Sequence, residues 1–201
     1  MKLILHRRNT RQELNATEGK YGIEVDIRSY GNALIIHHDP CVPGESFDEW
    51  IADYRHGTLI LNVKEEGLEA RLIALMKKKG IEDYFFLDQS FPFLVKWSKA
   101  VERRCAVRVS EFESIETALT LAGKVDWVWV DCFTQFPLSH DDAKRLQDAG
   151  FKLCLVSPEL QGRDAETEIP MLAKLLAERN IVAEAVCTKR PDLWETLAAN
   201  A

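Results

Sequence analysis

Residues 58–87, TLILNVKEEGLEARLIALMKKKGIEDYFFL, contain two short strand-like runs on either side of a helical pattern. The runs at 58–63 and 84–87 are rich in β-branched or aromatic residues, which favour strands. Between them, residues 67–79 carry apolar side chains at the spacing of an amphipathic helix. This order predicts a strand, a helix and a second strand that is parallel to the first.

The same alternation continues to the end of the chain. Further strands are predicted at 105–109, 126–130, 151–156 and 184–187, and further helices at 91–103, 113–121, 139–148, 165–178 and 191–199. With the runs ending at His6 and in residues 26–38, eight βα-like units result. We therefore predict an α/β protein with a single compact (β/α)8 TIM barrel over residues 1–201, in which some helices are brief or absent because the chain is short for this fold. An open doubly wound sheet is the alternative, although no GxGxxG or Walker-type phosphate loop supports it.

Composition and charge narrow the class of protein further. The chain is 46% apolar and 29% charged, which is typical of one globular domain, and its net charge of −6 argues against a nucleic-acid partner. The five cysteines form no CxxC pair and their odd number leaves no complete disulfide set, so we expect a soluble protein in the reducing cytoplasm. No apolar run approaches the ~18 residues of a membrane span, although Phe47, Trp50 and Phe136 would offer membrane contacts if their loops exposed them. The sequence leaves the oligomeric state open.

Chemically active side chains gather where the first strand-like runs end. They are His6-Arg7, Glu24 with Asp26, His37-His38-Asp39, and Asn62 with Lys64. In a barrel of parallel strands, the carboxyl ends of the strands surround the active site. The sequence therefore predicts a site built from this part of the chain.

The residue types indicate phosphoryl chemistry. Glu24 and Asp26 are two residues apart and share one face of a strand, and such a carboxylate pair suits a hard cation, Mg²⁺ or Ca²⁺. Asn62 and Lys64 repeat this spacing on the next predicted strand. They would add an amide oxygen for the metal and an ammonium group for a phosphate oxygen.

Two histidines complete the arrangement. His6 and His38 end separate apolar runs and could serve as general base and general acid on either side of a reacting phosphate. Strand alternation points His37 away from the side that His38 faces. Taken singly, a histidine is more often structural and a carboxylate pair is often a solvated rim, but four such groups on neighbouring strands favour a site.

An aromatic run later in the chain leaves two interpretations open. In Trp127-Val128-Trp129-Val130-Asp131 the tryptophans and Asp131 share one face. Either Trp129 lines a ligand pocket, or the tryptophans pack beneath a helix.

Five short motifs follow one another along the chain: His6-Arg7-Arg8-Asn9-Thr10, Glu24-Val25-Asp26, His38-Asp39-Pro40, Lys64, and Thr188-Lys189-Arg190-Pro191. In this order they resemble the glycerophosphodiester phosphodiesterase family, one of the barrel phosphodiesterases that also include phosphatidylinositol-specific phospholipase C and sphingomyelinase D. The resemblance implies a TIM barrel that binds a divalent cation. It further implies His6 and His38 as the acid/base pair, Arg7 and Lys64 as phosphate ligands, and Glu24 and Asp26 as metal ligands.

By this resemblance the chain is a compact and divergent member. Asn62 stands where these phosphodiesterases usually carry a third metal-binding glutamate, which predicts weaker metal binding or recruitment of Asp88 or Asp131. Arg8 replaces the glycine that normally follows the His-Arg pair. The segment from His38 to Lys64 is too short for the substrate-capping insertion of the glycerol-type enzymes.

We therefore predict a phosphoric diester hydrolase of lipid metabolism whose substrate is a small glycerophosphodiester or a phospholipid-derived head group. If the substrate carries a hydroxyl group next to phosphorus, the first product would be a cyclic phosphate. A non-catalytic barrel that binds a phosphate or sugar phosphate is the main alternative. A sugar isomerase or aldolase with Lys64 as a Schiff-base amine is a third, and the two histidines argue against it.

Overall fold

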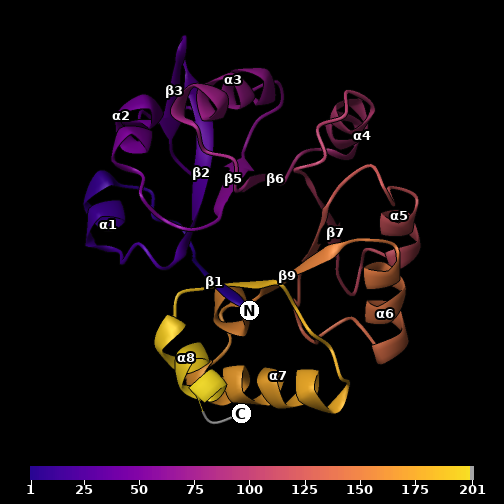
Figure 1. Cartoon of the computed structure of the whole chain (residues 1–201). Coiled ribbons are helices and arrows are strands. Elements are labelled where there is room, and N and C mark those ends of the chain that lie inside the picture. The colour runs from indigo at the N-terminus through magenta and orange to yellow at the C-terminus, as the bar shows by residue number, and fades with distance from the viewer. Residues whose placement is uncertain (200–201) are drawn as a thin grey trace. The chain divides into compact units, whose positions relative to one another are not determined.

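The computed structural model describes residues 1–199, in which strands and helices alternate along the chain (Figure 1). The strands are β1 (Lys2–Leu5), β2 (Gly22–Tyr30), β3 (Ala33–Ile36), β4 (Glu45–Ser46), β5 (Leu59–Val63), β6 (Tyr84–Leu87), β7 (Ala106–Val109), β8 (Trp127–Val130), β9 (Lys152–Val156) and β10 (Ala185–Thr188). The helices are α1 (Arg11–Ala16), α2 (Phe47–Trp50), α3 (Glu69–Lys79), α4 (Phe91–Lys99), α5 (Ile115–Leu119), α6 (His140–Asp148), α7 (Ala165–Glu178) and α8 (Pro191–Ala199), with 3₁₀ turns η1 (Ile51–Asp53) and η2 (Pro158–Gln161). Each strand and helix predicted beyond residue 57 is present, with ends that differ by a few residues at most.

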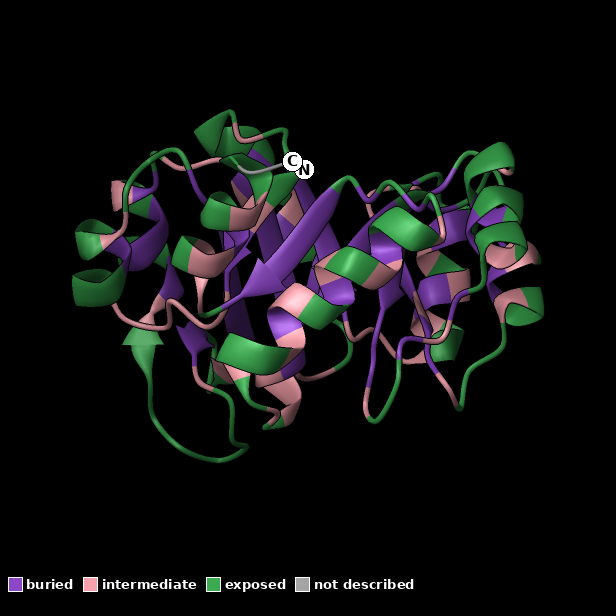
Figure 2. Cartoon of the chain, turned by 90° about the horizontal axis from the view of Figure 1, so that it is seen from below, coloured by how far each residue is buried: buried purple, intermediate pink, exposed green. Residues whose placement is uncertain are grey.

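The residues form two compact groups. The N-terminal unit is Ile4–Ala100, and the C-terminal unit is Met1–Leu3 with the chain from Val101 onward. Figure 2 shows that the strands of each unit are mostly buried, whereas the helices carry exposed residues on one side. That the chain acts as one domain over residues 1–201 stays a prediction.

In the N-terminal unit, four strands pair in parallel in the order β1, β2, β5 and β6. Register pairs join Ile4 to Gly22 and Asp26 to Asn62, and Asn62 also pairs with Leu87. All residues of β5 and β6 are buried, as expected for parallel strands covered on both faces. The carboxyl ends of these strands therefore meet at one edge of the sheet.

The prediction that His37 and His38 alternate along a strand differs from the structure of the segment after β2. Strand β3 folds back on β2 as an antiparallel hairpin, with Ile36 opposite Ile27, so β2 alone supplies the parallel strand of residues 26–38. Gly31, with φ of 59°, and Asn32 form the turn, and a Gly-Asn pair between apolar runs is a hairpin signal that the sequence does contain. Because β3 ends at Ile36, both histidines lie beyond the strand, and the expectation that they face opposite sides of it is wrong.

The short connection from β3 to β5 is packed rather than exposed. Phe47 and Trp50 are both fully buried, and Trp50 Nε1 donates to the backbone oxygen of Arg8 at 3.0 Å. Phe136, in the C-terminal unit, is only 9% exposed. The expectation that these three aromatic residues could lie on exposed loops is therefore wrong. Within residues 1–199, no helix combines the length and the apolar character needed to cross a membrane.

The C-terminal unit contains four parallel strands in the order β10, β9, β8 and β7. Trp127 pairs with Lys152, and Trp129 pairs with both Arg108 and Cys154. Both tryptophans are buried, and Lys152 Nζ lies 5.4 Å from the ring centre of Trp127. Lys2, the first residue of β1, donates its backbone N–H to Glu184 within this unit. All five cysteines are free thiols.

Candidate active site

The site predicted from the sequence lies in the N-terminal unit, where β1, β2 and β5 end. Strand β2 lies between the other two, so its inward-facing residues meet groups from both sides. Glu24 and Asp26 occupy this position, and neither is exposed to solvent. His6 and Arg7 follow β1, and Lys64 follows β5.

Glu24 is held by hydrogen bonds from both neighbouring strands. Its Oε2 accepts the backbone N–H of Arg7 at 2.7 Å, and its Oε1 accepts Nδ2 of Asn62 at 2.8 Å. His6 Nε2 lies 3.8 Å from Oε2. Burial raises the pKa of Glu24 to about 7 and the charge of Asp26 acts in the same direction, although the hydrogen bonds from Asn62 and Arg7 oppose the shift. Burial beside Asp26 therefore favours the protonated form of Glu24 more than exposure to solvent would.

Asp26 is surrounded by cationic and amide groups. Arg7 Nε lies 3.2 Å from its Oδ2, and Lys64 Nζ lies 3.4 Å from its Oδ1. Asn9 binds it reciprocally, because Nδ2 donates to the carboxylate at 2.9 Å and Oδ1 accepts the backbone N–H of Asp26 at 3.1 Å. A buried carboxylate needs such partners to remain charged.

Lys64 joins this cluster to the end of β6. Its Nζ lies 2.8 Å from Asp88 Oδ2, and only 14% of its side chain is exposed. Arg7 and Asp88 both have positive φ angles, 51° and 61°, in the region that favours glycine. For Arg7, the N–H bond to Glu24 offsets part of this conformational cost.

His38 occupies a different environment from the other predicted residues. Its side chain is 46% exposed, and Nδ1 lies 2.9 Å from Oδ1 of the neighbouring Asp39. Arg28 connects it to the site, since Nε donates to the backbone oxygen of His38 at 3.0 Å and a terminal nitrogen donates to that of Lys64 at 2.7 Å. The structure thus links six of the predicted residues through pairwise hydrogen bonds or ion pairs, namely His6, Arg7, Glu24, Asp26, Asn62 and Lys64. It places His38 in the loop that follows the β2–β3 hairpin.

The sequence prediction missed two residues, Arg28 and Asn9. Arg28 continues the alternation of Glu24 and Asp26 on β2, which is a signal that could have found it. Asn9 belongs to the first quoted motif, but its role depends on how the loop after β1 returns to β2. That return is also fixed by the backbone N–H of Arg8, which donates to the Glu24 carbonyl at 3.0 Å.

The residues around Asp26 fit a hard divalent cation. Asp26 Oδ1 and Asn62 Oδ1 are buried oxygens without a hydrogen-bond partner in the described chain, although Lys64 Nζ forms an ion pair with Asp26 Oδ1 at 3.4 Å. The two residues are register partners on adjacent strands. Residues 1–199 contain no group of three histidine, cysteine or acidic residues arranged to bind a metal. An ion here would therefore depend on two carboxylates and one amide.

The two predicted substitutes for a third carboxylate are already engaged. Asp88 pairs with Lys64. In the C-terminal unit, Asp131 accepts from Arg108 at 2.9 Å, from Gln161 at 2.6 Å and from the backbone N–H of Cys132 at 2.9 Å. Within residues 1–199, neither carboxylate has a buried oxygen that lacks a hydrogen bond, whereas Asp26 and Asn62 each have one.

The last motif of the resemblance forms a local network within the C-terminal unit. Thr188 Oγ1 and the backbone N–H of Lys189 both donate to Glu159 Oε1, at 2.7 and 2.8 Å. Arg190 pairs with Asp192 and Glu166. These contacts fix the connection between β10 and α8.

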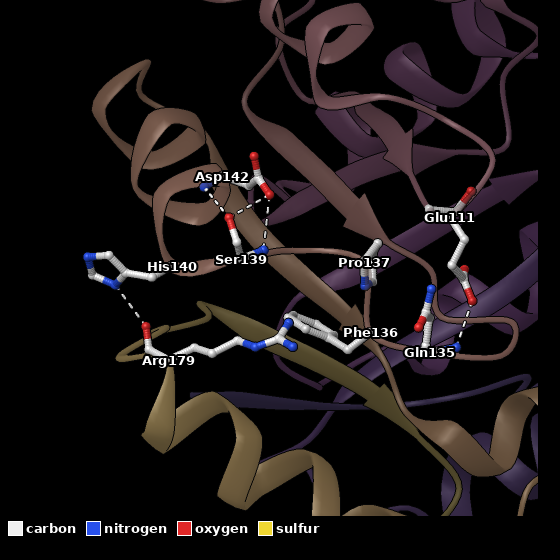
Figure 3. A pocket seen from close by; sticks show the side chains of 9 residues that line it. Glu111, Gln135, Phe136, Pro137, Ser139, His140, Asp142 and Arg179 are labelled. Carbon is white, nitrogen blue, oxygen red and sulfur yellow. Dashed lines mark hydrogen bonds between the residues drawn. The ribbon is translucent and has the colours of Figure 1, made fainter.

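A cavity of about 660 Å³ in the C-terminal unit lies outside the predicted site (Figure 3). Its polar side chains bond mainly to one another and to nearby backbone. Ser139 and Asp142 form the cap of α6, His140 Nδ1 contacts the Arg179 carbonyl at 2.8 Å, and Glu111 accepts the N–H of Gln135 at 2.7 Å. The polar side chains that line this cavity are therefore accounted for by local structural contacts.

Fold and site together define an α/β protein whose parallel strands end in a cluster of acidic, basic and imidazole groups. Among solved structures, a glycerophosphodiester phosphodiesterase from Agrobacterium tumefaciens strain C58 matches with a TM-score of 0.65 and 15% identity, covering 98% of this chain and 99% of that chain. A glycerophosphoryl diester phosphodiesterase from Parabacteroides distasonis gives 0.67 and 10% identity, with coverage of 99% and 86%. A mutant tryptophan synthase α-subunit from Pyrococcus furiosus gives 0.52 and 13%, with coverage of 93% and 86%.

No protein-family model and no curated protein matches the sequence. The structural likeness extends over nearly the whole chain and over nearly the whole of the Agrobacterium protein. The chain therefore has the TIM-barrel-like α/β fold of these phosphodiesterases, which confirms the predicted fold class.

Proposed function

We propose that this protein is a phosphodiesterase that cleaves a small phosphodiester, either a glycerophosphodiester or a phospholipid-derived head group. The observation that carries the proposal is the cluster formed by Glu24, Asp26, Arg7 and Lys64 at the strand ends, with His6 beside it. Buried carboxylates hold both cationic side chains in place before any substrate arrives. The fold shared with two phosphodiesterases supports the same interpretation.

Charge and proton transfer are divided among different residues in this proposal. Arg7 and Lys64 bind the phosphoryl oxygens and stabilise the negative charge that builds on them in the transition state. One of the two histidines removes a proton from the attacking oxygen, a P–O bond forms to that oxygen, and the ester P–O bond breaks. The other histidine protonates the departing alkoxide, so that a phosphomonoester and an alcohol are released.

The attacking oxygen defines the product. If it belongs to water, the reaction is a hydrolysis. If it belongs to a hydroxyl group of the substrate next to phosphorus, the same proton transfers yield a cyclic phosphate, which is a lyase-like first step.

A divalent cation, Mg²⁺ or Ca²⁺, is an additional part of the proposal. Asp26 and Asn62 would hold it together with Glu24, and it would supply further positive charge for the phosphoryl oxygens. Asn62 gives this site one negative charge fewer than a glutamate would. We therefore expect weak metal affinity.

A panel of phosphodiesters tests the proposal directly. Glycerophosphodiesters and bis(p-nitrophenyl) phosphate are incubated with wild-type protein in Mg²⁺, Ca²⁺ or EDTA. His6→Ala and His38→Ala should each lower kcat at least 100-fold, because each removes a general acid or base. His140→Ala, an exposed histidine in the C-terminal unit, should retain full activity. Full activity in either site variant would refute the two-histidine mechanism.

The amide at position 62 favours one alternative, a barrel that binds a phosphorylated ligand without cleaving it. Absence of turnover on every substrate, together with binding of a phosphodiester or sugar phosphate that Lys64→Ala abolishes, would establish this function. Calorimetry with folded protein distinguishes the two cases.

A further inference from the structure

A second cavity, of about 310 Å³, adjoins Lys64 in the N-terminal unit. It is formed by the residues that follow β5 and β6 and by the starts of α3 and α4. Its lining includes Lys64 and Asp88, which belong to the site above, and Gln89. It also includes three glutamates that the proposed chemistry does not use, Glu65, Glu66 and Glu69.

The charge of this lining is strongly unbalanced. Asp88 is paired with Lys64, the only basic residue among those that line the cavity. Glu65 accepts a hydrogen bond from Ser29 at 2.5 Å, and Glu66 accepts one from Ser90. Hydroxyl donors satisfy one oxygen of each carboxylate but leave its charge in place. The cavity wall is therefore acidic beside a site built to bind phosphate.

Glu69 supplies an independent indication that a ligand belongs there. Its residue is 1% exposed, and Oε1 accepts Nε2 of Gln89 at 3.0 Å. Its Oε2, and likewise Oε1 of Gln89, are buried without a hydrogen-bond partner in the described chain. Native proteins rarely leave buried acceptors unsatisfied, so two of them in one cavity call for a donor from outside the chain.

A primary ammonium group would supply the positive charge and the hydrogen-bond donors that the cavity lining does not provide. It brings a positive charge and three N–H donors, whereas a hydroxyl group brings one donor and no charge. Burial of a carboxylate is tolerated when a cation pairs with it. The small volume of the cavity suits a short chain rather than an acyl group.

We propose that this cavity binds the ammonium group of the substrate's leaving alcohol, so that the preferred substrates are phosphodiesters with a short aminoalkyl ester. The inference rests on the proposed function, because Lys64 places the phosphate next to the cavity. Glu69 and Gln89 accept N–H groups of the ammonium, and Glu65 and Glu66 stabilise its charge. The cavity thereby selects the alcohol, and the histidines cleave the bond to it.

Two substrates of nearly equal size test the inference. The 2-aminoethyl and n-propyl esters of methyl phosphate differ in one group, an ammonium against a methyl, and neither carries a hydroxyl group that could attack phosphorus. We expect wild-type protein to have at least a tenfold higher kcat/KM for the aminoethyl ester, and Glu69→Gln to reduce that ratio toward one. Glu66→Gln, an exposed position, should reduce it less, and Glu82→Gln, an exposed glutamate outside the cavity, should leave it unchanged. Thermal unfolding of each variant verifies that it is folded.

The outcomes separate this inference from the proposed function. Equal kcat/KM for both esters, or preference for the n-propyl ester, overturns the ammonium site while phosphodiesterase activity stands. If neither ester is cleaved, binding is measured by calorimetry with the same two compounds. Tighter binding of the aminoethyl ester that Glu69→Gln weakens supports the ammonium site without catalysis, and equal or absent binding overturns it.

Discussion

Asp26 and Asp39 both lie beside residues proposed to act on the substrate, yet their surroundings are opposite. Asp26 is fully buried on a central strand and is held by Arg7, Asn9 and Lys64. Asp39 lies beyond the β2–β3 hairpin, two-thirds of its side chain is exposed, and it pairs with the adjacent His38. The first carboxylate belongs to the interior and the second to the surface.

This difference in burial matches two tasks of a phosphodiesterase site, stabilisation of charge and exchange of protons with the substrate. Groups that stabilise charge work best when they are fixed before the reaction, as Arg7 and Lys64 are by their ion pairs with Asp26. A group that exchanges protons with a substrate must be reachable, and His38 is. In the proposed mechanism, the residues that follow the parallel strands would therefore supply fixed positive charge, and the loop after the β2–β3 hairpin would supply an accessible histidine.

The largest expected effect is on stability, in Asp26→Ala. The variant leaves the charges of Arg7 and Lys64 without their shared partner, which should lower the free energy of unfolding by about 3 kcal/mol. Urea denaturation followed by circular dichroism measures the change. Asp39→Ala is the matched control and should unfold at the same urea concentration as wild type. Equal stability of both variants would mean that the buried cluster does not hold this part of the fold together.

The buried cluster around Asp26 could be predicted from the sequence, whereas the exposed segment that carries His38 and Asp39 could be predicted only in part. The spacing of Glu24 and Asp26 places both side chains on one face, and the order of strands brings Asn62 and Lys64 alongside. Both facts depend on local periodicity, which a sequence records. The direction of β3 depends on its pairing with β2, so periodicity alone could not place His37 and His38.

Contacts that depend on strand register could not be predicted from the sequence either. Arg28 donates to two backbone carbonyls, and every residue type offers a carbonyl, so no pattern marks its partners. The ammonium site proposed above rests on Glu69, whose position at the first turn of α3 has a simpler explanation in the helix dipole. Only its burial and its unpartnered oxygen distinguish it from an ordinary helix start.

Arg28→Met tests whether the hairpin is tied to the parallel strands. The variant keeps the aliphatic part of the side chain but removes the bonds to the carbonyls of His38 and Lys64, which should cost about 2 kcal/mol of stability. Because the substrate phosphate would still meet Arg7 and Lys64, kcat should fall several-fold more than KM rises.

A residue of α3 that bonds to the same hairpin gives the matched control. Arg71 donates to the carbonyl of Asn32 in the turn between β2 and β3, away from the proposed site. Arg71→Met should therefore leave kcat unchanged. An equal loss of kcat in both variants would show that the whole hairpin, rather than the tie at His38, sets the rate.

The smallest expected effect comes from a carboxylate in the C-terminal unit that is held by N–H groups instead of cations. Partial burial alone would raise the pKa of Glu111, but the backbone N–H groups of Gln135 and Thr134 outweigh it and lower the pKa to about 2. A lowered pKa stabilises the fold above the unfolded-state value of about 4.3, and this contribution is lost as the pH falls toward 2.

Glu111→Gln should accordingly destabilise the protein by about 1–2 kcal/mol at pH 6, after allowance for solvent screening, and by progressively less between pH 4 and pH 2. Urea midpoints of the two proteins across this range measure the convergence. Glu116→Gln, which removes an exposed ion pair with Arg145, should show little effect at any pH. A difference in urea midpoint between Glu111→Gln and wild type that stays constant down to pH 2 would contradict this prediction. It would mean that the packing of the Glu111 side chain, and not its charge, stabilises residues 133–135. In that case the contrast between buried and exposed carboxylates would be confined to the cluster around Asp26.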